Sequence, residues 1–395
     1  ILVSMMGYAF YFRTPDNQLD QLFIHRLPKW LTVSDPTSLK NFYQGGSTLY
    51  APENYVPWIV PVVCWSAFCA VLLFTTLCLN SILRKHWVES ERLTFPIIML
   101  PLEMTENSAS IFRNRYFWLA FGIAGTLTLI AGLNYLYPNI PCIRIVRRNF
   151  GQFITEYPWR AMGGIMVGFY FWAIGIAYLM PLELSFSCWF FYLFIKAELV
   201  VSYMLGLNEL RVAGTGFDAS YPFLNSQSYG AYLGFFTMSM WAGRRYLGRV
   251  WRTAFKGTGE EDDSAEAVSY RTALIGAILG VLALGAFARS MNMSGPIIVT
   301  FFILYFVFAV TASRIRAELG FPTHDMHVMA PQYPILTALG TQHIPRQDIV
   351  GFSMLWWFNR TYASHPSPHQ FESLKIAERS GTPARQMFIA ALIAG

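Results

Sequence analysis

The sequence predicts an all-α fold, a polytopic bundle of transmembrane helices that includes re-entrant or broken helices. Three observations predict it. Hydrophobic residues make up 54% of the 395 residues and charged residues only 13%, about half the charged share of an ordinary soluble domain. Apolar runs of about 20 residues, the length of helix that crosses a bilayer core, recur along the chain. Two prolines, Pro96 and Pro101, interrupt the apolar stretch between Glu89 and Glu106, which predicts a broken segment.

The apolar runs predict the membrane spans in chain order, and those at the two ends of the sequence are partial. The predicted spans are residues 1–12, 57–83, 116–137, 161–181, 184–207, 228–243, 272–290, 296–313 and a segment from about 387. Because both ends read as membrane helices cut short, we expect the natural protein to continue beyond them.

These spans divide the chain into four regions. Residues 1–56 hold the partial first span and an ordered cap outside the membrane, rich in Pro, Tyr and Trp. Residues 57–243 form an N-terminal transmembrane half, 244–270 a cytoplasmic linker and 271–395 a C-terminal transmembrane half. The linker contains the acidic stretch "KGTGEEDDSAEAVSY", which we expect to be mobile.

Loop charge predicts the orientation of the bundle. Alternation of the spans places residues 84–115, 244–271 and 314–348 on one side, and these loops carry more Lys and Arg than the others. An excess of positive residues marks cytoplasmic loops, so this side is predicted to face the cytoplasm. Near the end of the chain, Phe371, Leu374 and Ala377 recur at helical spacing, which predicts an amphipathic surface helix.

The broken segment 89–106 is the first candidate for a functional site. Backbone groups freed by prolines in lipid must be buried in protein or line a wet cavity, and secondary transporters build substrate sites from broken helices. A surface loop that dips into the interface is the alternative. The stretch "ERLTFP" at 91–96 shares Leu, Phe and Pro in register with "AELGFP" at 317–322. Such an echo favours an internal repeat without deciding it.

Charged residues in or beside apolar runs are the second kind of candidate, because they are costly in lipid unless paired or facing water. Structural ion pairs between helices and arginines that reach the membrane surface are the alternatives. Glu198 is the candidate for proton coupling. The residues assigned to the substrate or ion pathway are Glu91, Pro96, Pro101, Glu103, Lys196, Glu198, Arg316, Glu318 and Asp325.

The sequence lacks the motifs that several classes of function require. The sequence has no P-loop, no dinucleotide-binding glycine motif, no GxSxG and no HExxH, which argues against an ATP-driven pump or a membrane protease. No histidine lies in an apolar run, so a bis-histidine haem is not expected. The five cysteines form no CxxC pair, and the net charge of +6 is spread over the loops. We therefore predict no enzyme, cofactor, metal or nucleic-acid partner.

The stretches "RKHWVESERLTFPIIMLPLEM", "EYPWRA", "MPLELSFSCWFFYLF", "YGAYLGF", "SYRTALIG", "RIRAELGFPTHD" and "PHQFESLKIAER" resemble a family of uncharacterised bacterial polytopic membrane proteins. That family is distantly similar to the oligopeptide transporter superfamily through the "L-x-F-P" and "R-x-R-A-E-x-G" segments. The resemblance implies a proton-coupled carrier in a bacterial inner membrane. The Asn-Pro-Gly signature of those carriers is missing from this sequence.

These observations together predict a secondary transporter of a small polar solute: a peptide, an amino acid or a metal chelate. Its expected partners are the lipid bilayer and the solute, with a homo-oligomer or other membrane subunits left open. A non-catalytic structural or accessory subunit of a larger membrane complex is the rival, and a membrane enzyme acting on lipid-linked substrates is a third interpretation.

Overall fold

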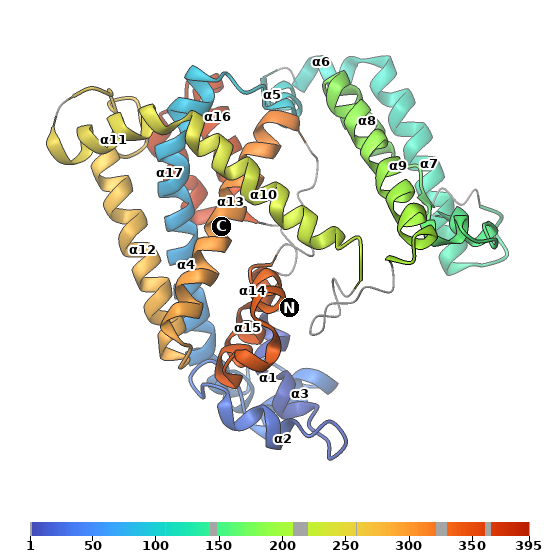
Figure 1. The fold of residues 1–395 in the computed structure, drawn as a ribbon, viewed down its shortest axis with the longest axis vertical. Helices are drawn as coiled ribbons and strands as arrows, with labels where there is room; N and C mark the ends of the chain where they lie inside the picture. Colours follow the sequence, from blue (N-terminus) through green and yellow to red (C-terminus); the bar gives the residue numbers. More distant parts are fainter. Residues whose placement is uncertain are drawn as a thin grey trace.

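The computed structural model describes residues 2–106, 108–142, 148–207, 220–257, 259–320, 330–359 and 365–394. This part of the chain is helical apart from one antiparallel pair of two-residue strands, β1 (Arg148–Asn149) and β2 (Met166–Val167). The all-α prediction is therefore confirmed for the described residues. Figure 1 shows a body of helices around α4, with further helices to one side of it.

The N-terminal half contains the following helices: α1 (Leu2–Tyr11), α2 (Leu19–Leu22), η1 (Ile24–Arg26), α3 (Pro36–Gln44), α4 (Pro52–Lys85), η2 (His86–Ser90), η3 (Pro96–Ile98), α5 (Met99–Glu106), α6 (Ser108–Arg113), α7 (Arg115–Leu136), η4 (Phe150–Phe153), η5 (Trp159–Met162), α8 (Phe171–Leu179), α9 (Leu182–Met204) and α10 (Leu224–Ala242). The remainder contains α11 (Arg244–Lys256), α12 (Tyr270–Ser290), α13 (Gly295–Leu319), α14 (Gln332–Leu339), η7 (Thr341–His343), α15 (Arg346–Asn359), α16 (Pro366–Ser380) and α17 (Ala384–Ala394).

Five of the described helices are long and apolar enough to cross a membrane: α4 together with η2, α7, α9, α12 and α13. They coincide with the predicted spans 57–83, 116–137, 184–207, 272–290 and 296–313. The predicted span 161–181 is wrong, because this stretch forms η5, β2 and the nine-residue α8 instead of one helix. Two consecutive glycines follow η5, and Gly163 has a φ of 67°, a conformation that ends a helical turn.

Close packing of α12 against α4 builds the centre of the body. Gly276 and Gly280 of α12 lie one turn apart and face α4. A Cβ at Gly276 would lie 2.9 Å from the sulfur of Cys78, and a Cβ at Gly280 would overlap Thr75. Small residues at this spacing let two helices approach closely, so that van der Waals contact holds them together.

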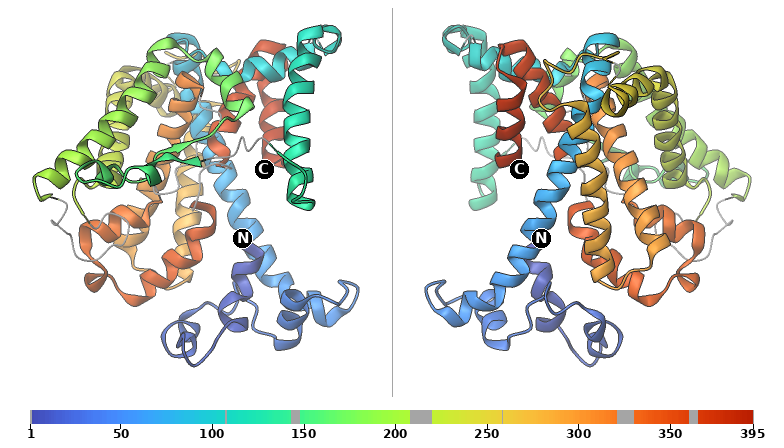
Figure 2. Two further views of the ribbon diagram at one scale, coloured as in Figure 1. Left: turned by 90° about the vertical axis from the view of Figure 1, so that its right-hand side faces the viewer. Right: turned by 90° about the vertical axis from the view of Figure 1, so that its left-hand side faces the viewer.

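Hydrogen bonds hold together the N-terminal segment for which the sequence predicts a cap; its location outside the membrane stays a prediction. Asp35 caps α3, its side chain accepting a hydrogen bond from the Ser38 N–H at 2.7 Å. The Ser38 hydroxyl in turn donates to the Asn54 carbonyl and accepts from the indole N–H of Trp58 at 2.7 Å. These bonds fasten α3 to the first turns of α4, and Figure 2 shows the cap at this end of the helix.

The acidic connection between α11 and α12 is fixed to the protein, contrary to the expected mobile linker. Glu266, whose side chain is 2% exposed, pairs with Arg84 of α4 at 2.7 Å. Glu261 pairs with Lys85 at 3.2 Å and with Arg249 of α11 at 2.6 Å. The sequence shows a stretch of small and acidic residues, but its cationic partners lie on other elements.

The prediction that residues 314–348 share one side is also wrong. Asp348, in the first turn of α15, accepts hydrogen bonds from the backbone N–H and the hydroxyl of Ser294 at 2.6 and 2.7 Å. Ser294 precedes α13, whereas Arg314 lies at its opposite end. Arg314 and Asp348 therefore lie at opposite ends of α13, and α14 and α15 lie toward the end that carries the cap (Figure 1).

The predicted surface helix, α16, is buried. Its apolar residues Phe371 and Leu374 are 0% and 1% exposed, and the polar Gln370 and Lys375 are also buried. The helix packs between α4 and α13. A pattern with one apolar face predicted a surface location, but polar partners on the two neighbouring helices cover the other face as well.

The helices α7, α8 and α9 lie on one side of the body in Figure 1, and Figure 2 shows α7 set well apart from α9. Large apolar side chains cover them on the outside, and none of the most apolar window of α7 is buried. Apolar helices with so little protein contact are compatible with a location in a bilayer.

Gly280→Val tests the packing of α12 on α4. The larger side chain would overlap Thr75, and we expect a loss of about 1–3 kcal/mol in the free energy of unfolding, the usual cost of overpacking. Unfolding of the purified protein in detergent measures it. Gly125→Val on α7, where a Cβ has no neighbour within 4 Å, is the matched control. Equal stability of the two variants would contradict the close approach.

Glu261→Gln tests the attachment of the acidic connection. Burial raises the pKa of Glu261, but the hydrogen bonds and charges of Arg249 and Lys85 outweigh burial and hold that pKa below the usual value. The pairs therefore stabilise the protein above the pKa of an unfolded glutamate, by about 1 kcal/mol. This contribution is lost as the pH falls through the lower, folded pKa.

Thermal unfolding between pH 7 and pH 3 measures the effect. We expect the melting temperature of the Glu261→Gln variant to lie below that of the unmodified protein at pH 7 and to converge with it at acidic pH. The exposed Glu103→Gln variant should follow the unmodified protein throughout. A difference for Glu261→Gln that stays constant with pH would contradict the assignment.

Candidate functional site

A layer of polar side chains crosses the body in the C-terminal third of α4 and α13. Asn80 of α4 donates to the Ser367 carbonyl at 2.9 Å, and the Ser367 hydroxyl donates to the Asn80 side-chain oxygen at 3.1 Å. The hydroxyl of Ser313 on α13 lies 2.8 Å from that of Ser367. Gln370 donates to the Leu73 carbonyl of α4 at 3.2 Å. These bonds satisfy polar groups that would be costly in an apolar interior.

This layer lies at the start of α16, where the extended backbone of His365 makes a break in helical structure. The helix α15 ends at Asn359, and α16 begins at Pro366 with His365 as its N-cap. The His365 ring accepts a hydrogen bond from the Ser367 N–H at 3.3 Å. Buried Gln332, at the start of α14, donates to the buried Asn359 side chain at 3.3 Å. Phe352 of α15 contacts Phe301 of α13, and Ser367 of α16 contacts Ser313, so the two helices pack on successive parts of α13.

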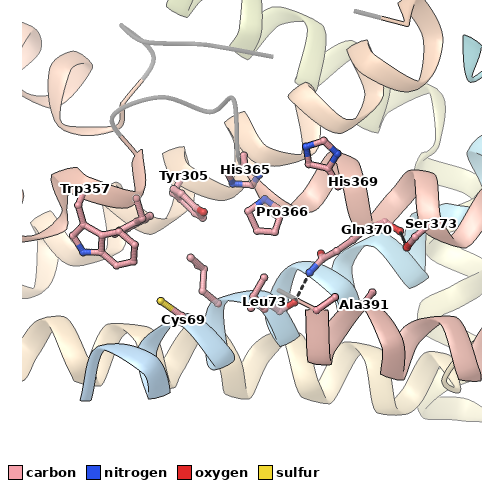
Figure 3. A pocket seen from close by; sticks show the side chains of 13 residues that line it. Cys69, Leu73, Tyr305, Trp357, His365, Pro366, His369, Gln370, Ser373 and Ala391 are labelled. Carbon is pink, nitrogen blue, oxygen red and sulfur yellow. Dashed lines mark hydrogen bonds between the residues drawn. The ribbon is translucent and has the colours of Figure 1, made fainter. Parts of the chain in front are cut away.

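A cavity of about 490 Å³ lies beside the break between α15 and α16. Figure 3 shows its wall, with Cys69 and Leu73 from α4 opposite residues of α13, α15 and α16, and Ala391 of α17 beside Leu73. Its hydrogen-bonding groups are Tyr305, His365, His369, Gln370 and Ser373. The remaining lining residues are Cys69, Leu72, Leu73, Trp357, Phe358, Pro366, Ala391 and Ala394.

The cavity offers hydrogen bonds and apolar surface together. Among the described residues that line it there is no carboxylate, lysine or arginine. Pockets with a mainly apolar wall and a few convergent polar groups are the usual form of a small-molecule site. This site is therefore suited to a ligand that carries donors and acceptors without needing a fixed counter-charge.

The two proline-containing segments that resemble each other in sequence lie against each other. The Phe95 N–H donates to the Ala317 carbonyl at 2.8 Å, and the Thr94 hydroxyl donates to the Glu318 carbonyl at 3.0 Å. Gly320 lies against the Pro96 ring so closely that a Cβ would come within 2.8 Å of it. In the described part of the chain, these two segments contact each other directly, with no cavity between them.

Glu91 holds this contact together electrostatically. It forms an ion pair with Arg314 of α13 and lies 2.8 Å from the His86 ring nitrogen. The Arg314 guanidinium lies over the ring of Trp87 at 5.5 Å. Several buried polar atoms of these residues have no hydrogen-bond partner, among them Trp87 Nε1 and Arg314 Nη1. A buried group left in this state is costly, so the cluster is a candidate site for a proton or a water molecule.

The other predicted site residues lie apart from one another. Pro101 and Glu103 are exposed in α5. Lys196 of α9 donates to the carbonyls of Met162 and Gly164 at 2.8 and 2.7 Å. Glu198 accepts from Gln227 of α10 at 2.9 Å. Asp325 lies outside the described residues.

Arg316 and Glu318 end α13 with different surroundings. Arg316 is 5% exposed and pairs with Glu372 of α16 through two hydrogen bonds, one of them 3.1 Å long. Glu318 is half-buried, and one carboxylate oxygen lies 3.7 Å from Arg314 Nε. Because the Arg316 guanidinium donates to both carboxylate oxygens of Glu372, this arginine has the geometry of a structural ion pair.

None of the residues that line the cavity is among the predicted site residues. Tyr305 and Cys69 lie within apolar runs and carry no pattern that separates them from the core. His365 and His369 stand beside prolines, which indicated a helix start but not its burial. The one usable signal was the density of polar residues in "HPSPHQFES", which exceeds what one solvent-facing stripe requires.

Removal of Arg316 tests whether it is structural. Breaking a buried ion pair leaves an unpaired charge, so we expect Arg316→Leu to lower the free energy of unfolding by about 3 kcal/mol. The double variant Arg316→Leu with Glu372→Leu should recover most of this loss, because it removes both charges. Arg271→Leu, at an exposed position of α12, is the control. A double variant less stable than the single one would contradict the pairing.

Comparison with known proteins adds one match. A family described as a family of unknown function (DUF6785) matches residues 1–395. Neither the curated proteins nor the solved structures contain a match to the chain. The relation to the oligopeptide transporter superfamily stays a prediction from the resemblance of short motifs. The match covers the whole sequence, and the chain therefore belongs to the DUF6785 family.

Proposed function

We propose that the protein is an integral membrane secondary transporter that binds a small polar solute in the cavity beside the α15–α16 break. One observation carries the proposal: the extended backbone of buried His365 interrupts helical structure before α16, next to a cavity near the middle of the two longest apolar helices. Non-helical backbone at membrane depth is tolerated where it is buried in protein or lines a wet cavity. Transporters place their substrate sites at such discontinuous helices.

The lining of the cavity restricts the class of solute that it can bind. Peptides and free amino acids carry charged ends, whereas the described lining has no lysine, arginine or carboxylate to pair with them. Trp357 and Tyr305 supply aromatic surface, and Gln370 and Ser373 supply hydrogen bonds. We propose a solute without a strong net charge, such as a neutral metal chelate or a capped or cyclic peptide. The predicted bacterial inner membrane is part of this proposal.

Proton coupling is assigned to Glu91 in preference to Glu198. Glu198 pairs with Gln227 away from the cavity. Glu91 joins the ends of α4 and α13 through His86 and Arg314, and both of these helices line the cavity. Protonation of the carboxylate would weaken the ion pair with Arg314, and this is how proton uptake would loosen the contact between the two helices.

Cys69 tests whether the cavity is wet. It lines the cavity, whereas Cys78, on the same helix, is 1% exposed. Two variants that each retain one of these cysteines, with the other four replaced by Ser, are treated in proteoliposomes with a charged, membrane-impermeant maleimide. We expect labelling of Cys69 and none of Cys78. If Cys69 reacts as poorly as Cys78 in the folded protein while both react after denaturation, the cavity is closed to water.

Uptake into proteoliposomes under an imposed proton gradient tests transport itself. The panel holds neutral chelates, capped and free dipeptides, and amino acids. Ala391→Phe would fill the cavity and abolish uptake, whereas Ala390→Phe, at an exposed neighbouring position that does not line it, would leave uptake unchanged. Equal uptake by both variants would remove the cavity from the transport path.

The rival function is a structural or accessory subunit of a larger membrane complex. The observation that favours it is the set of apolar helices α7, α8 and α9, which bury little of their surface in the protein. A subunit of this kind would co-purify with other proteins at fixed stoichiometry. Such co-purification, together with no uptake from the panel and an unreactive Cys69, would replace the transporter proposal.

A further inference from the structure

A second cavity, of about 520 Å³, lies between α12 and α13. Small residues open it: Gly285 and Ala286 on α12, and Gly295 on α13. At Gly285 a Cβ would meet only Ile298, at 3.7 Å. Phe302 and Phe306 extend the groove along α13, and the lining is apolar except for Arg289.

The dimensions of this groove match one leaflet of a membrane. From Gly295 to Phe306 it follows 11 residue steps of α13, which is about 17 Å at 1.5 Å per residue. Half of the roughly 30 Å hydrocarbon core is about 15 Å. The groove starts where α12 ends and α13 begins, and it reaches toward the middle of both helices.

Arg289 stands at the outer end of the groove. It is exposed in the last turn of α12, and one guanidinium nitrogen donates to the Met293 carbonyl at 2.8 Å. A guanidinium carries five N–H donors in a fork that fits a phosphate. An apolar channel of leaflet length with a cation at its mouth is complementary in charge and length to a phospholipid.

We infer that the groove between α12 and α13 binds one anionic phospholipid, with an acyl chain along Gly285, Ala286 and Phe302 and its phosphate on Arg289. The inference rests on the membrane location within the proposed function and is independent of transport. Its occupant differs from the exchanging lipids around the bundle, because the groove encloses the chain on two sides and the arginine fixes the headgroup.

The test measures lipid retained by the full chain. Protein purified in detergent is washed free of loosely held lipid, supplied with phosphatidylglycerol or phosphatidylcholine, and examined by native mass spectrometry. We expect one phosphatidylglycerol per chain. Arg289→Gln should weaken its binding about tenfold, equivalent to about 1.4 kcal/mol. Gly285→Leu, which fills the groove, should abolish it.

Two matched controls separate the groove from the general lipid-facing surface. Arg271→Gln removes an exposed arginine at the other end of α12, and Gly125→Leu adds the same side chain to the exposed face of α7. Both should retain the lipid. Size-exclusion chromatography establishes that each variant is folded, and Arg289→Gln keeps the inference testable if Gly285→Leu does not fold.

Three outcomes would overturn the inference. Retention by Gly285→Leu and Arg289→Gln equal to the unmodified protein would mean that only exchanging lipid surrounds the bundle. Equal loss in the two controls would have the same meaning. A dimer that disappears in Gly285→Leu would identify a second copy of the chain as the occupant. None of these results depends on solute uptake, so failure here leaves the transporter proposal standing.

Discussion

The structure depends on pairing the polar side chains of α16 inside a body of apolar helices. Asn80 and Ser313 meet its first turn, Arg316 meets its middle through Glu372, and Arg84 reaches Glu378 near its end at 3.4 Å. Each contact joins α16 to a helix far away in sequence. Because an unpaired polar group in this interior is costly, the contacts fix where α16 lies along α4 and α13. The break before it, and the cavity beside that break, follow from this position.

Much of the fold could be predicted because an apolar run long enough to cross a bilayer is a local property of the sequence. The five longest apolar helices were located to within a few residues, and the prolines correctly marked an interruption after α4. The expectations for 161–181, 314–348 and α16 failed for another reason. Whether a glycine pair ends a helix, whether two segments lie at the same end of a helix and whether a polar face finds partners are decided by contacts between distant segments.

The candidate site was less predictable than the fold. Charge was used as the guide to function, and it selected Glu91, Arg316 and Glu318, which hold helix ends together. The cavity is lined instead by residues such as Tyr305, Gln370 and Trp357, whose types are common in any helical core. The resemblance between "ERLTFP" and "AELGFP" was informative in a different way, since the structure places Phe95 and Ala317 in direct contact. Whether the two halves share an internal repeat stays a prediction.

The length of α4 has a consequence for whatever approaches the protein. Its 34 residues extend about 51 Å, against a hydrocarbon core of roughly 30 Å. With the Lys85 end at one water boundary, the Pro52 end would project about 20 Å past the other. The helix would then extend beyond the bilayer and hold the first 50 residues above the lipid surface. A molecule arriving from that compartment would contact this N-terminal segment before it reached the bilayer.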